Sequence, residues 1–289
     1  MQSTSKLVMV RPDYFGPNIQ TAASNVFQKD SGDISNCLLE WEAMKDTLIS
    51  EGIEVMEFEA IKNAPDAIFP NWFTTYDNQT LDLFPMEAPN RQLERANPSL
   101  DKLLHAYKIE IDFTEMELKG LALESTSSLV LDRINNIAYC SISSRSNLNL
   151  ARDWATKKGF ELIAFHSSYL NKPIYHTNVV IWIGTSIAGV CEDAIRDDDL
   201  IIIRETLQKD KQILNLTIDQ LGAYCGNMLE VKNNKGELLL LMSQSANRAL
   251  SQKQKDILQE FYPKLLTVDL TNIEKIGGGS ARCMVQELY

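Results

Sequence analysis

Residues 128–142 read Ser-Leu-Val-Leu-Asp-Arg-Ile-Asn-Asn-Ile-Ala-Tyr-Cys-Ser-Ile, two apolar runs separated by a polar turn. A short Asn-rich turn between two strand-forming runs favours a β-hairpin, so the pattern predicts strands over 128–132 and 137–142. A helix over 148–158 and a third strand over 161–165 follow. The order strand, strand, helix, strand is typical of an α/β fold.

Similar elements are predicted along the rest of the chain. A second hairpin turns at Lys232–Gly236, between strands over 228–231 and 238–242. The remaining elements are strands over 7–11, 67–69, 179–183 and 284–288, and helices over 35–50, 99–107, 199–209, 218–224 and 247–262. The longest irregular stretch is 78–97, and no Pro/Gly/Ser-rich linker divides the chain. We therefore expect a single α/β domain over residues 1–289.

Composition narrows the class of protein. The net charge of −11 and the lack of a dense basic cluster argue against nucleic-acid binding and favour a small cationic or zwitterionic ligand. No apolar run approaches the length of a membrane span, and the first residues lack a signal-peptide core. The five cysteines are irregularly spaced, which argues against a disulfide framework and a zinc site. We expect a cytoplasmic protein that needs no metal or cofactor. Assembly into a homo-oligomer is compatible with the sequence.

A glycine-rich stretch near the end of the chain carries a candidate nucleophile: Gly277-Gly278-Gly279-Ser280-Ala281-Arg282-Cys283. Structural cysteines usually lie among apolar neighbours, whereas positive charge and exposed N–H groups lower a thiol pKa. We therefore expect Cys283 to be a nucleophile in a flexible, polar loop. A phosphate-binding glycine loop must open a helix, and only six residues follow Cys283, which excludes that alternative.

A cysteine nucleophile needs a general base, and the chain has three histidines. His105 falls in a predicted helix, where we expect a half-buried structural residue, and His166 ends the strand over 161–165. His176 lies in a polar turn before the strand over 179–183. Because residues at the mouth of a strand can face a cleft, we expect His176 to be the base.

Three further residues each have a structural and a functional interpretation. Glu124 either sits in an exposed turn or orients an imidazole. Asp66 either caps a turn or forms a rigid pocket wall between two prolines. Arg145 either lies on the surface or clamps a carboxylate. The residues alone leave these alternatives open.

Seven short motifs carry a resemblance to a known superfamily. In chain order they are Val-Arg-Pro (10–12), Pro-Asp-Ala-Ile-Phe (65–69), Leu-Glu-Ser-Thr-Ser-Ser-Leu-Val-Leu-Asp-Arg (123–133), Ser-Ser-Arg-Ser-Asn (143–147), Tyr-His-Thr-Asn (175–178), Gly-Asn-Met-Leu-Glu (226–230) and Gly-Gly-Gly-Ser-Ala-Arg-Cys-Met (277–284). The chain resembles the guanidino-group-modifying penteins, and most closely the arginine-deiminase-related branch that includes citrulline hydrolases. The resemblance implies a pentein α/β-propeller of five ββαβ-like units with pseudo-fivefold symmetry and a central site.

The resemblance also implies a role for each candidate residue. Cys283 would be the nucleophile, His176 the general acid and base, and Glu124 the carboxylate that supports the histidine. Arg145 would bind the substrate carboxylate, and Asp66 would contact the amino-acid end or the reactive head. The implied reaction is attack of the thiolate on the central carbon of a guanidino or ureido group, followed by hydrolysis of an S-linked intermediate. A histidine pKa near 6.5 would suit this chemistry, and N–H groups of 277–282 are expected to stabilise developing charge.

Two asparagines bear on the substrate. Asn178 stands where arginine deiminases carry an acid, and a neutral amide pairs well with a ureido oxygen. Asn71 lies near a position where some relatives have acids. We therefore expect hydrolysis of citrulline to ornithine, CO2 and ammonia, or deimination of arginine. An amidinotransferase and a non-catalytic binding protein are the alternatives.

Three positions depart from the usual residues of the branch. Tyr76 stands in place of a histidine, and Ser125 and Ser127 stand in place of glycines. If the two glycine positions require positive φ, serine adds backbone strain there.

Overall fold

The computed structural model describes residues 1–29 and 31–289. These residues form five three-stranded sheets and one two-stranded sheet. In each of the five larger sheets one strand pair is antiparallel and the other is parallel. In each of these sheets helical residues connect the two strands of the parallel pair, because such a pair needs a crossover connection. The predicted α/β class and the order strand, strand, helix, strand are therefore confirmed.

The unit predicted from residues 128–165 shows why the sequence folds in this way. It contains β6 (Val130–Asp132), β7 (Ile137–Ser141), α6 (Leu148–Lys158) and β8 (Glu161–Phe165). Asn147 caps the start of α6 through its side chain, and Gly159 ends it with a left-handed φ of 73°. One face of α6 buries Leu150, Ala151, Trp154 and Ala155.

Three further units repeat this order. One unit consists of β3 (Phe73–Thr75), β4 (Thr80–Leu83), α3 (Pro89–Gln92), η1 (Leu93–Ala96), α4 (Leu100–Ala106) and β5 (Lys108–Asp112). The next consists of β11 (Ile181–Ile183), β12 (Ile187–Val190), η4 (Glu192–Ala194), α7 (Asp197–Leu207) and β13 (Gln212–Asn215). The last consists of β14 (Leu229–Lys232), β15 (Leu238–Ser243), α9 (Gln244–Ala249), α10 (Gln252–Phe261) and β16 (Leu265–Val268).

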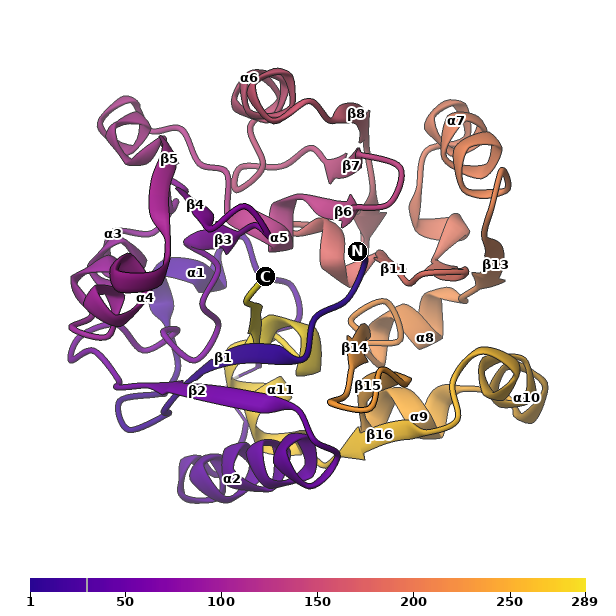
Figure 1. Cartoon of the computed structure of the whole chain (residues 1–289), viewed down its shortest axis with the longest axis horizontal. Helices are drawn as coiled ribbons and strands as arrows, with labels where there is room; N and C mark the ends of the chain where they lie inside the picture. Colours follow the sequence, from indigo (N-terminus) through magenta and orange to yellow (C-terminus); the bar gives the residue numbers. More distant parts are fainter. Residues whose placement is uncertain (30) are drawn as a thin grey trace.

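The fifth sheet joins the two ends of the chain. β1 (Lys6–Val10) runs parallel to β2 (Glu54–Phe58), and α2 (Ile34–Ser50) connects them. On its other edge β1 pairs antiparallel with β17 (Gln286–Glu287). Figure 1 shows the five units following one another around the middle of the molecule, with α2, α4, α6, α7 and α10 on the outside. Both termini lie near this middle.

Shorter elements connect the units and shape the middle of the molecule. They are α1 (Ile19–Ala22), η2 (Thr114–Lys119), α5 (Ser125–Ser128), β9 (Ser168–Tyr169), β10 (Lys172–Pro173), η3 (Thr177–Val179), α8 (Ile218–Gly222), α11 (Thr271–Gly277) and η5 (Ala281–Met284). No helix among the residues described is long and apolar enough to cross a bilayer.

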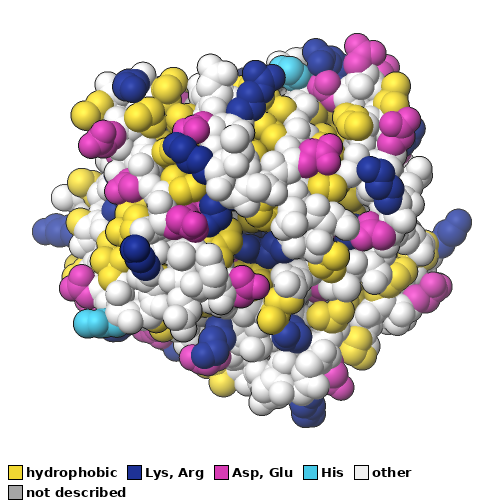
Figure 2. Space-filling view, turned by 45° about the horizontal axis from the view of Figure 1, so that its top comes forward, with side chains coloured by type: hydrophobic (Ala, Val, Ile, Leu, Met, Phe, Trp, Pro, Cys, Tyr) yellow, Lys and Arg dark blue, Asp and Glu magenta, His cyan; other side chains and the backbone are white. Residues whose placement is uncertain are grey.

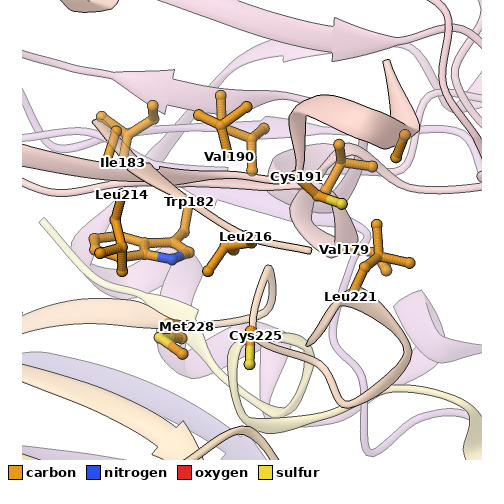
Figure 3. Close-up of a cluster of buried hydrophobic side chains, with 14 of the residues drawn as sticks. Val179, Trp182, Ile183, Val190, Cys191, Leu214, Leu216, Leu221, Cys225 and Met228 are labelled. Carbon is orange, nitrogen blue, oxygen red and sulfur yellow. The ribbon is translucent and has the colours of Figure 1, made fainter. Parts of the chain in front are cut away.

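The apolar core is divided among the units. The cluster around β11, β12 and β13 includes Trp182, Leu214, Leu221 and Met228, all at least nine-tenths buried. Figure 3 shows part of this cluster, where side chains of the sheet meet those of α8 and of the loop after it. This packing fixes the loop over 223–228, which reaches the middle of the molecule.

Several predicted elements differ from the structure. Residues 67–69 form turns, in which the N–H of Ala67 bonds to Ala64 and that of Phe69 to Asp66, so the predicted strand is wrong. The helix predicted over 247–262 is two helices, because Ser251 caps the start of α10. The stretch 78–97 contains β4, α3 and η1 and is not irregular.

Three predicted strands are shorter than expected because each adjoins a helical turn. The strand over 128–132 begins only after α5, and that over 179–183 only after η3. The strand over 284–288 is reduced to β17, since η5 occupies the residues before it. These helical turns bring polar side chains to the middle of the molecule.

Candidate active site

Cys283 lies at the end of a closely packed turn. α11 ends at Gly277, and Gly278 takes a left-handed φ of 64° at the C-cap. η5 then places Cys283 with 3% of its surface exposed. A Cβ on Gly277 would lie 2.6 Å from the Phe69 ring, so only glycine allows the ring to pack here. The loop is buried and closely packed, contrary to the expectation of a flexible loop, although polar side chains contact it.

Two asparagine side chains approach the sulfur of Cys283. Nδ2 of Asn227 donates to Sγ over 3.1 Å, and Nδ2 of Asn178 lies 3.7 Å from it. Burial raises the pKa of the Cys283 thiol, and it outweighs the hydrogen bonds and the Arg282 charge that lower it. The expectation of a thiol pKa below the ordinary range is therefore wrong for the site without substrate.

The charged and N–H groups of Arg282 are engaged away from the cavity. Its guanidinium donates to the carbonyl of Val285 and forms an ion pair with Glu287, both at 3.0 Å. The backbone N–H groups of Arg282 and Cys283 donate to Oδ1 of Asn227 over 3.1 and 3.3 Å. These N–H groups are not free to stabilise charge on a substrate, contrary to the expectation for Arg282.

His176 and Glu124 form a buried pair. Nε2 of His176 lies 2.7 Å from Oε2 of Glu124, and neither side chain is more than 2% exposed. An ionised carboxylate only accepts hydrogen bonds, so this contact places the proton on Nε2 and a lone pair on Nδ1. Nδ1 is buried and has no hydrogen-bond partner within 1–29 and 31–289. His176 can therefore exchange a proton through Nδ1.

The surroundings lower the pKa of both members of the pair. Burial raises the pKa of Glu124, but the charge of Arg145 and the hydrogen bond and charge of His176 lower it to about 2. Burial lowers the pKa of His176 to about 4, although the bond to Glu124 opposes this. The expectation of a pKa near 6.5 is wrong for the site without substrate, which holds a carboxylate and a neutral imidazole at pH 7.

We expect the protein to lose stability as the pH falls from about 6.5 to about 4. In the unfolded chain an imidazole takes up a proton near pH 6.5, whereas folded His176 does so only near pH 4. The unfolded state binds more protons across this window, so stability is fully present above it and decreases as the pH falls. Urea denaturation between pH 4 and 7 measures the effect.

The control for this experiment is an exposed histidine. His176→Asn should remove up to about 3 kcal/mol of this pH dependence, whereas His105→Asn, in the exposed face of α4, should retain it. Equal pH dependence in both variants would show that His176 is not held in its neutral form.

Two buried arginines flank Glu124. Nη1 of Arg91 and Nη1 of Arg145 lie 3.4 and 3.8 Å from Oε2 of Glu124. Arg91 also forms an ion pair with Glu94 at 2.7 Å, and burial raises the pKa of Glu94 to about 7 in spite of it. Sequence analysis missed Arg91, because it lies in the stretch taken as irregular.

The structure brings the predicted substrate residues to one cavity. Asp66, Asn71 and Arg145 line it together with His176 and Cys283; Asn25, Phe69, Arg91, Tyr175, Gly277 and Gly279 complete the lining. Glu124 lies behind His176, and Asn178 contacts the sulfur. All seven predicted site residues are therefore neighbours in space, although they come from five separate parts of the chain.

Asp66 offers this cavity a carboxylate oxygen without a partner. Its Oδ2 accepts from Nδ2 of Asn18 and from the hydroxyl of Thr21, each at 2.8 Å. Its Oδ1 is buried and accepts no hydrogen bond from any residue described. An unpaired buried carboxylate oxygen is costly, so a ligand N–H at this position would be stabilising.

Arg145 is buried, which excludes the interpretation that it lies on the surface. Its guanidinium donates to Ser24 Oγ over 2.8 Å and to the carbonyl of Thr21 over 3.0 Å. It also stacks over the Tyr175 ring at 4.7 Å from the centroid. These contacts engage Nε and Nη2 of Arg145, whereas Nη1 lies on the side of Glu124, 3.8 Å from its Oε2.

The remaining residues singled out in the sequence lie elsewhere or support the site. His105 and His166 are exposed. The hydroxyl of Tyr76 donates to Asp82 over 2.7 Å, and Tyr76 is not among the residues lining the cavity. Ser125 has a φ of 45°, so the strain expected from a serine at a glycine position is present there.

The described residues contain no cluster of three or more metal-ligating side chains.

Asn227 is the second residue that sequence analysis missed. It occurs in the motif over 226–230, where an amide next to a glycine is the only sequence signal. Asn227 and Cys283 are 56 positions apart in the sequence, so only the tertiary structure shows that they are close. On the face shown in Figure 2, acidic and basic side chains are interspersed, without the continuous basic surface that nucleic acids need.

Comparisons with known proteins identify a family for the chain. The family model of N,N dimethylarginine dimethylhydrolase, eukaryotic, matches residues 11–289. No curated protein sequence matches the chain.

Solved structures share the fold at low sequence identity. The N-terminal domain of ArgZ, covalently bound to a reaction intermediate, is 16% identical with a TM-score of 0.78, over 98% of this chain and 97% of that one. ArgZ is described as an arginine dihydrolase from the ornithine-ammonia cycle in cyanobacteria. DDAH from Pseudomonas aeruginosa, in complex with citrulline, is 14% identical with a TM-score of 0.71, over 99% and 100% of the two chains.

Proposed function

The chain belongs to the eukaryotic N,N-dimethylarginine dimethylhydrolase family, and from this membership we propose that it hydrolyses a C–N bond in the guanidino group of a free amino acid, with Cys283 as the nucleophile. One observation carries the proposal. Cys283, His176 on its Glu124 partner, and the unpaired Oδ1 of Asp66 meet at a single cavity. This combines a nucleophile, a proton-transfer group and an acceptor for a substrate N–H.

The electrostatics favour a guanidinium over a neutral ureido group. A guanidinium would bring both positive charge and N–H donors to the unpaired oxygen of Asp66. Its charge would also favour the thiolate of Cys283, whose pKa burial raises in the empty site. Arginine and its N-methylated derivatives are therefore the first candidates for the substrate.

The proposed reaction has two halves. Nδ1 of His176 takes the proton of the Cys283 thiol, the sulfur attacks the central guanidino carbon, and His176 returns the proton to the departing nitrogen. Ammonia leaves from arginine, or dimethylamine from N,N-dimethylarginine, and an S-linked intermediate remains. Water then attacks this carbon, and one of its protons passes through His176 to the departing sulfur. The second proton is released to solvent, where the free amine takes it up. The product in both cases is citrulline.

Supporting residues would hold the charges in place during this cycle. Glu124 would keep the imidazole oriented and stabilise its protonated form between the two transfers. Arg145 and Arg91 are the two cationic groups in the cavity lining for a substrate carboxylate. We further propose that residues 1–289 form one domain and that its five sheets form a propeller with pseudo-fivefold symmetry, since all five share one strand order.

Citrulline is the second candidate, and Asn178 favours it. An amide in place of an acid near the sulfur can donate to or accept from a neutral ureido group. Citrulline would be converted to ornithine, CO2 and ammonia.

A substrate panel with one variant separates the two candidates. We expect the wild-type protein to release ammonia from arginine or dimethylamine from N,N-dimethylarginine, with citrulline as product. Asn178→Asp adds a carboxylate near the reacting carbon, so the ratio of kcat/KM for arginine over citrulline should rise roughly tenfold, about 1.4 kcal/mol. Steady-state assays of amine release and of citrulline or ornithine provide the measurement.

Two outcomes would contradict this assignment. Ornithine from citrulline, with no turnover of guanidino substrates, would favour the ureido candidate. No turnover of any of these compounds by a folded protein would contradict both. Cys283→Ser serves as the blank for non-enzymatic release.

A further inference from the structure

The side chain of Asn227 lies next to the sulfur of Cys283, and every donor and acceptor of its amide forms a hydrogen bond. It lies in the loop between α8 and β14 and is 1% exposed. Its Oδ1 accepts from the backbone N–H groups of Arg282 and Cys283, and its Nδ2 donates to the carbonyl of Asn178 over 2.9 Å and to Sγ of Cys283 over 3.1 Å. An amide has two acceptor sites and two donors, so all four are satisfied.

These contacts fix which end of the amide faces the sulfur. If the amide were reversed, its NH2 group would meet two backbone N–H donors, and its oxygen would meet the carbonyl of Asn178. Both contacts would be repulsive, so the donor end must point toward Sγ. The second amide near the sulfur differs, because Nδ2 and Oδ1 of Asn178 lie at 3.7 and 3.9 Å and neither is close.

We propose that Asn227 is a catalytic residue, which donates a hydrogen bond to the sulfur of Cys283 and stabilises its thiolate both as nucleophile and as leaving group. The proposal deepens the proposed function, on which it rests. A fixed N–H donor aimed at a sulfur binds S⁻ more strongly than SH, because a hydrogen bond to an ionised acceptor is the stronger one. The sulfur carries negative charge twice in the cycle, before attack and on expulsion by water.

The loop around Asn227 holds this donor in place. Its backbone N–H donates to the carbonyl of Tyr224 over 2.9 Å, and Tyr224 has a left-handed φ of 65°. A Cβ on Gly226 would lie 1.9 Å from the carbonyl oxygen of Val179, so the loop packs directly on the backbone of η3. The amide is therefore positioned before any substrate binds, as a preorganised electrostatic group must be.

The test measures the reactivity of the sulfur without any substrate. Iodoacetamide reacts with the thiolate, and mass spectrometry of the peptide that contains Cys283 gives the rate at each pH. For Asn227→Ala we expect alkylation at pH 7 to be about tenfold slower than in the wild type, with the deficit shrinking toward pH 9.5. With arginine or N,N-dimethylarginine, kcat should fall about 10²-fold with little change in KM.

Two further variants guard against a purely structural effect. Asn227→Asp keeps an oxygen for the two backbone N–H groups but presents a second oxygen to the sulfur, so its alkylation at pH 7 should be slower still. Asn233→Ala is the matched control, because buried Asn233 also accepts from two backbone N–H groups, those of Lys235 and Glu237, in the hairpin after β14. It should leave both rates unchanged.

The outcomes separate this proposal from the proposed function. Alkylation of both Asn227 variants at or above the wild-type rate at every pH would overturn the role of Asn227, because a merely loosened loop would expose the sulfur. Slower alkylation in a protein that turns over no guanidino compound would uphold the hydrogen bond and overturn the proposed function.

Discussion

Cys283→Ser is expected to lower kcat for arginine or N,N-dimethylarginine by at least about 10⁴-fold, a loss of the size seen when a catalytic nucleophile is removed. A serine hydroxyl fits the space but remains protonated at neutral pH. Hydrogen bonds from Asn227 and Asn178 are not sufficient to stabilise its ionised form. Nothing else in the cavity lining is a nucleophile of comparable reactivity, within the residues described. The variant should nevertheless fold and bind substrate.

The experiment pairs turnover with binding. Steady-state amine release measures kcat, and isothermal titration calorimetry measures the affinity of Cys283→Ser for arginine. Cys140→Ser is the matched control, because Cys140 is as deeply buried in β7 and lies outside the cavity lining. More than one per cent of wild-type turnover in Cys283→Ser would show that the sulfur is not the nucleophile.

An S-linked intermediate gives a second readout of the same residue. Rapid quenching of the wild-type protein during turnover, followed by digestion and mass spectrometry, should detect an adduct on the peptide that contains Cys283. The adduct should be absent from Cys283→Ser under the same conditions.

Glu124→Gln is expected to lower kcat by about 10²- to 10⁴-fold, with a smaller change in KM. The glutamine keeps the size of the side chain but carries no charge, so the imidazolium of His176 is no longer stabilised during the two proton transfers. Its amide also presents a donor as readily as an acceptor to Nε2, which weakens the selection of the productive tautomer. The acid limb of the pH–rate profile should move with this change.

The same substitution should also reduce stability. Arg91 and Arg145 lie within 4 Å of Glu124, and all three side chains are at least 97% buried. Removing the carboxylate leaves two buried guanidinium groups with less compensation, which we expect to cost about 3 kcal/mol. Urea denaturation at pH 7 measures this loss.

Glu230→Gln provides the control for a buried carboxylate. Glu230 is 2% exposed and accepts from the hydroxyls of Thr185 and Tyr262, away from the cavity lining. It should lose stability without losing turnover per folded molecule. If both glutamine variants lose activity only in proportion to unfolding, Glu124 has no role in the proton transfers.

Cys283→Ser and Glu124→Gln both test a site in which the thiol and the imidazole are neutral at pH 7. Burial raises the pKa of the Cys283 thiol and lowers that of the His176 imidazole to about 4, so both are uncharged at pH 7 in the empty cavity. A reactive ion pair would then form only when a charged substrate enters. The raised pKa of the thiol therefore favours a guanidinium over a neutral ureido substrate.

Local sequence patterns were sufficient to predict the elements that are stabilised by contacts between adjacent residues. The hairpin turns at 133–136 and 232–236, and the helix over 148–158, are where the sequence predicts them. In each case a turn or cap is encoded by adjacent residues, Asn147 and Gly159 among them. The order of motifs also indicated the superfamily and the candidate residues Cys283, His176 and Glu124.

At several positions where the sequence misled, a distant contact was responsible. Residues 67–69 are apolar enough for a strand, but no strand among the described residues pairs with them. They form turns instead, and the Phe69 ring packs against Gly277 and Gly279. Arg282 stands next to Cys283 in sequence, yet its guanidinium faces Glu287. No local sequence pattern indicates that Arg91 and Asn227 lie at the site.

The sequence by itself therefore determined the α/β class, the two hairpins, helices such as α6, and the types of side chain available for chemistry. The tertiary structure alone decided the burial of Cys283, the pairing of His176 with Glu124 and the approach of Asn227 to the sulfur. The physical reason is that protonation states depend on burial and on charges within a few ångströms. Those neighbours come from segments more than 50 residues apart, which only the packing of the five sheets brings together.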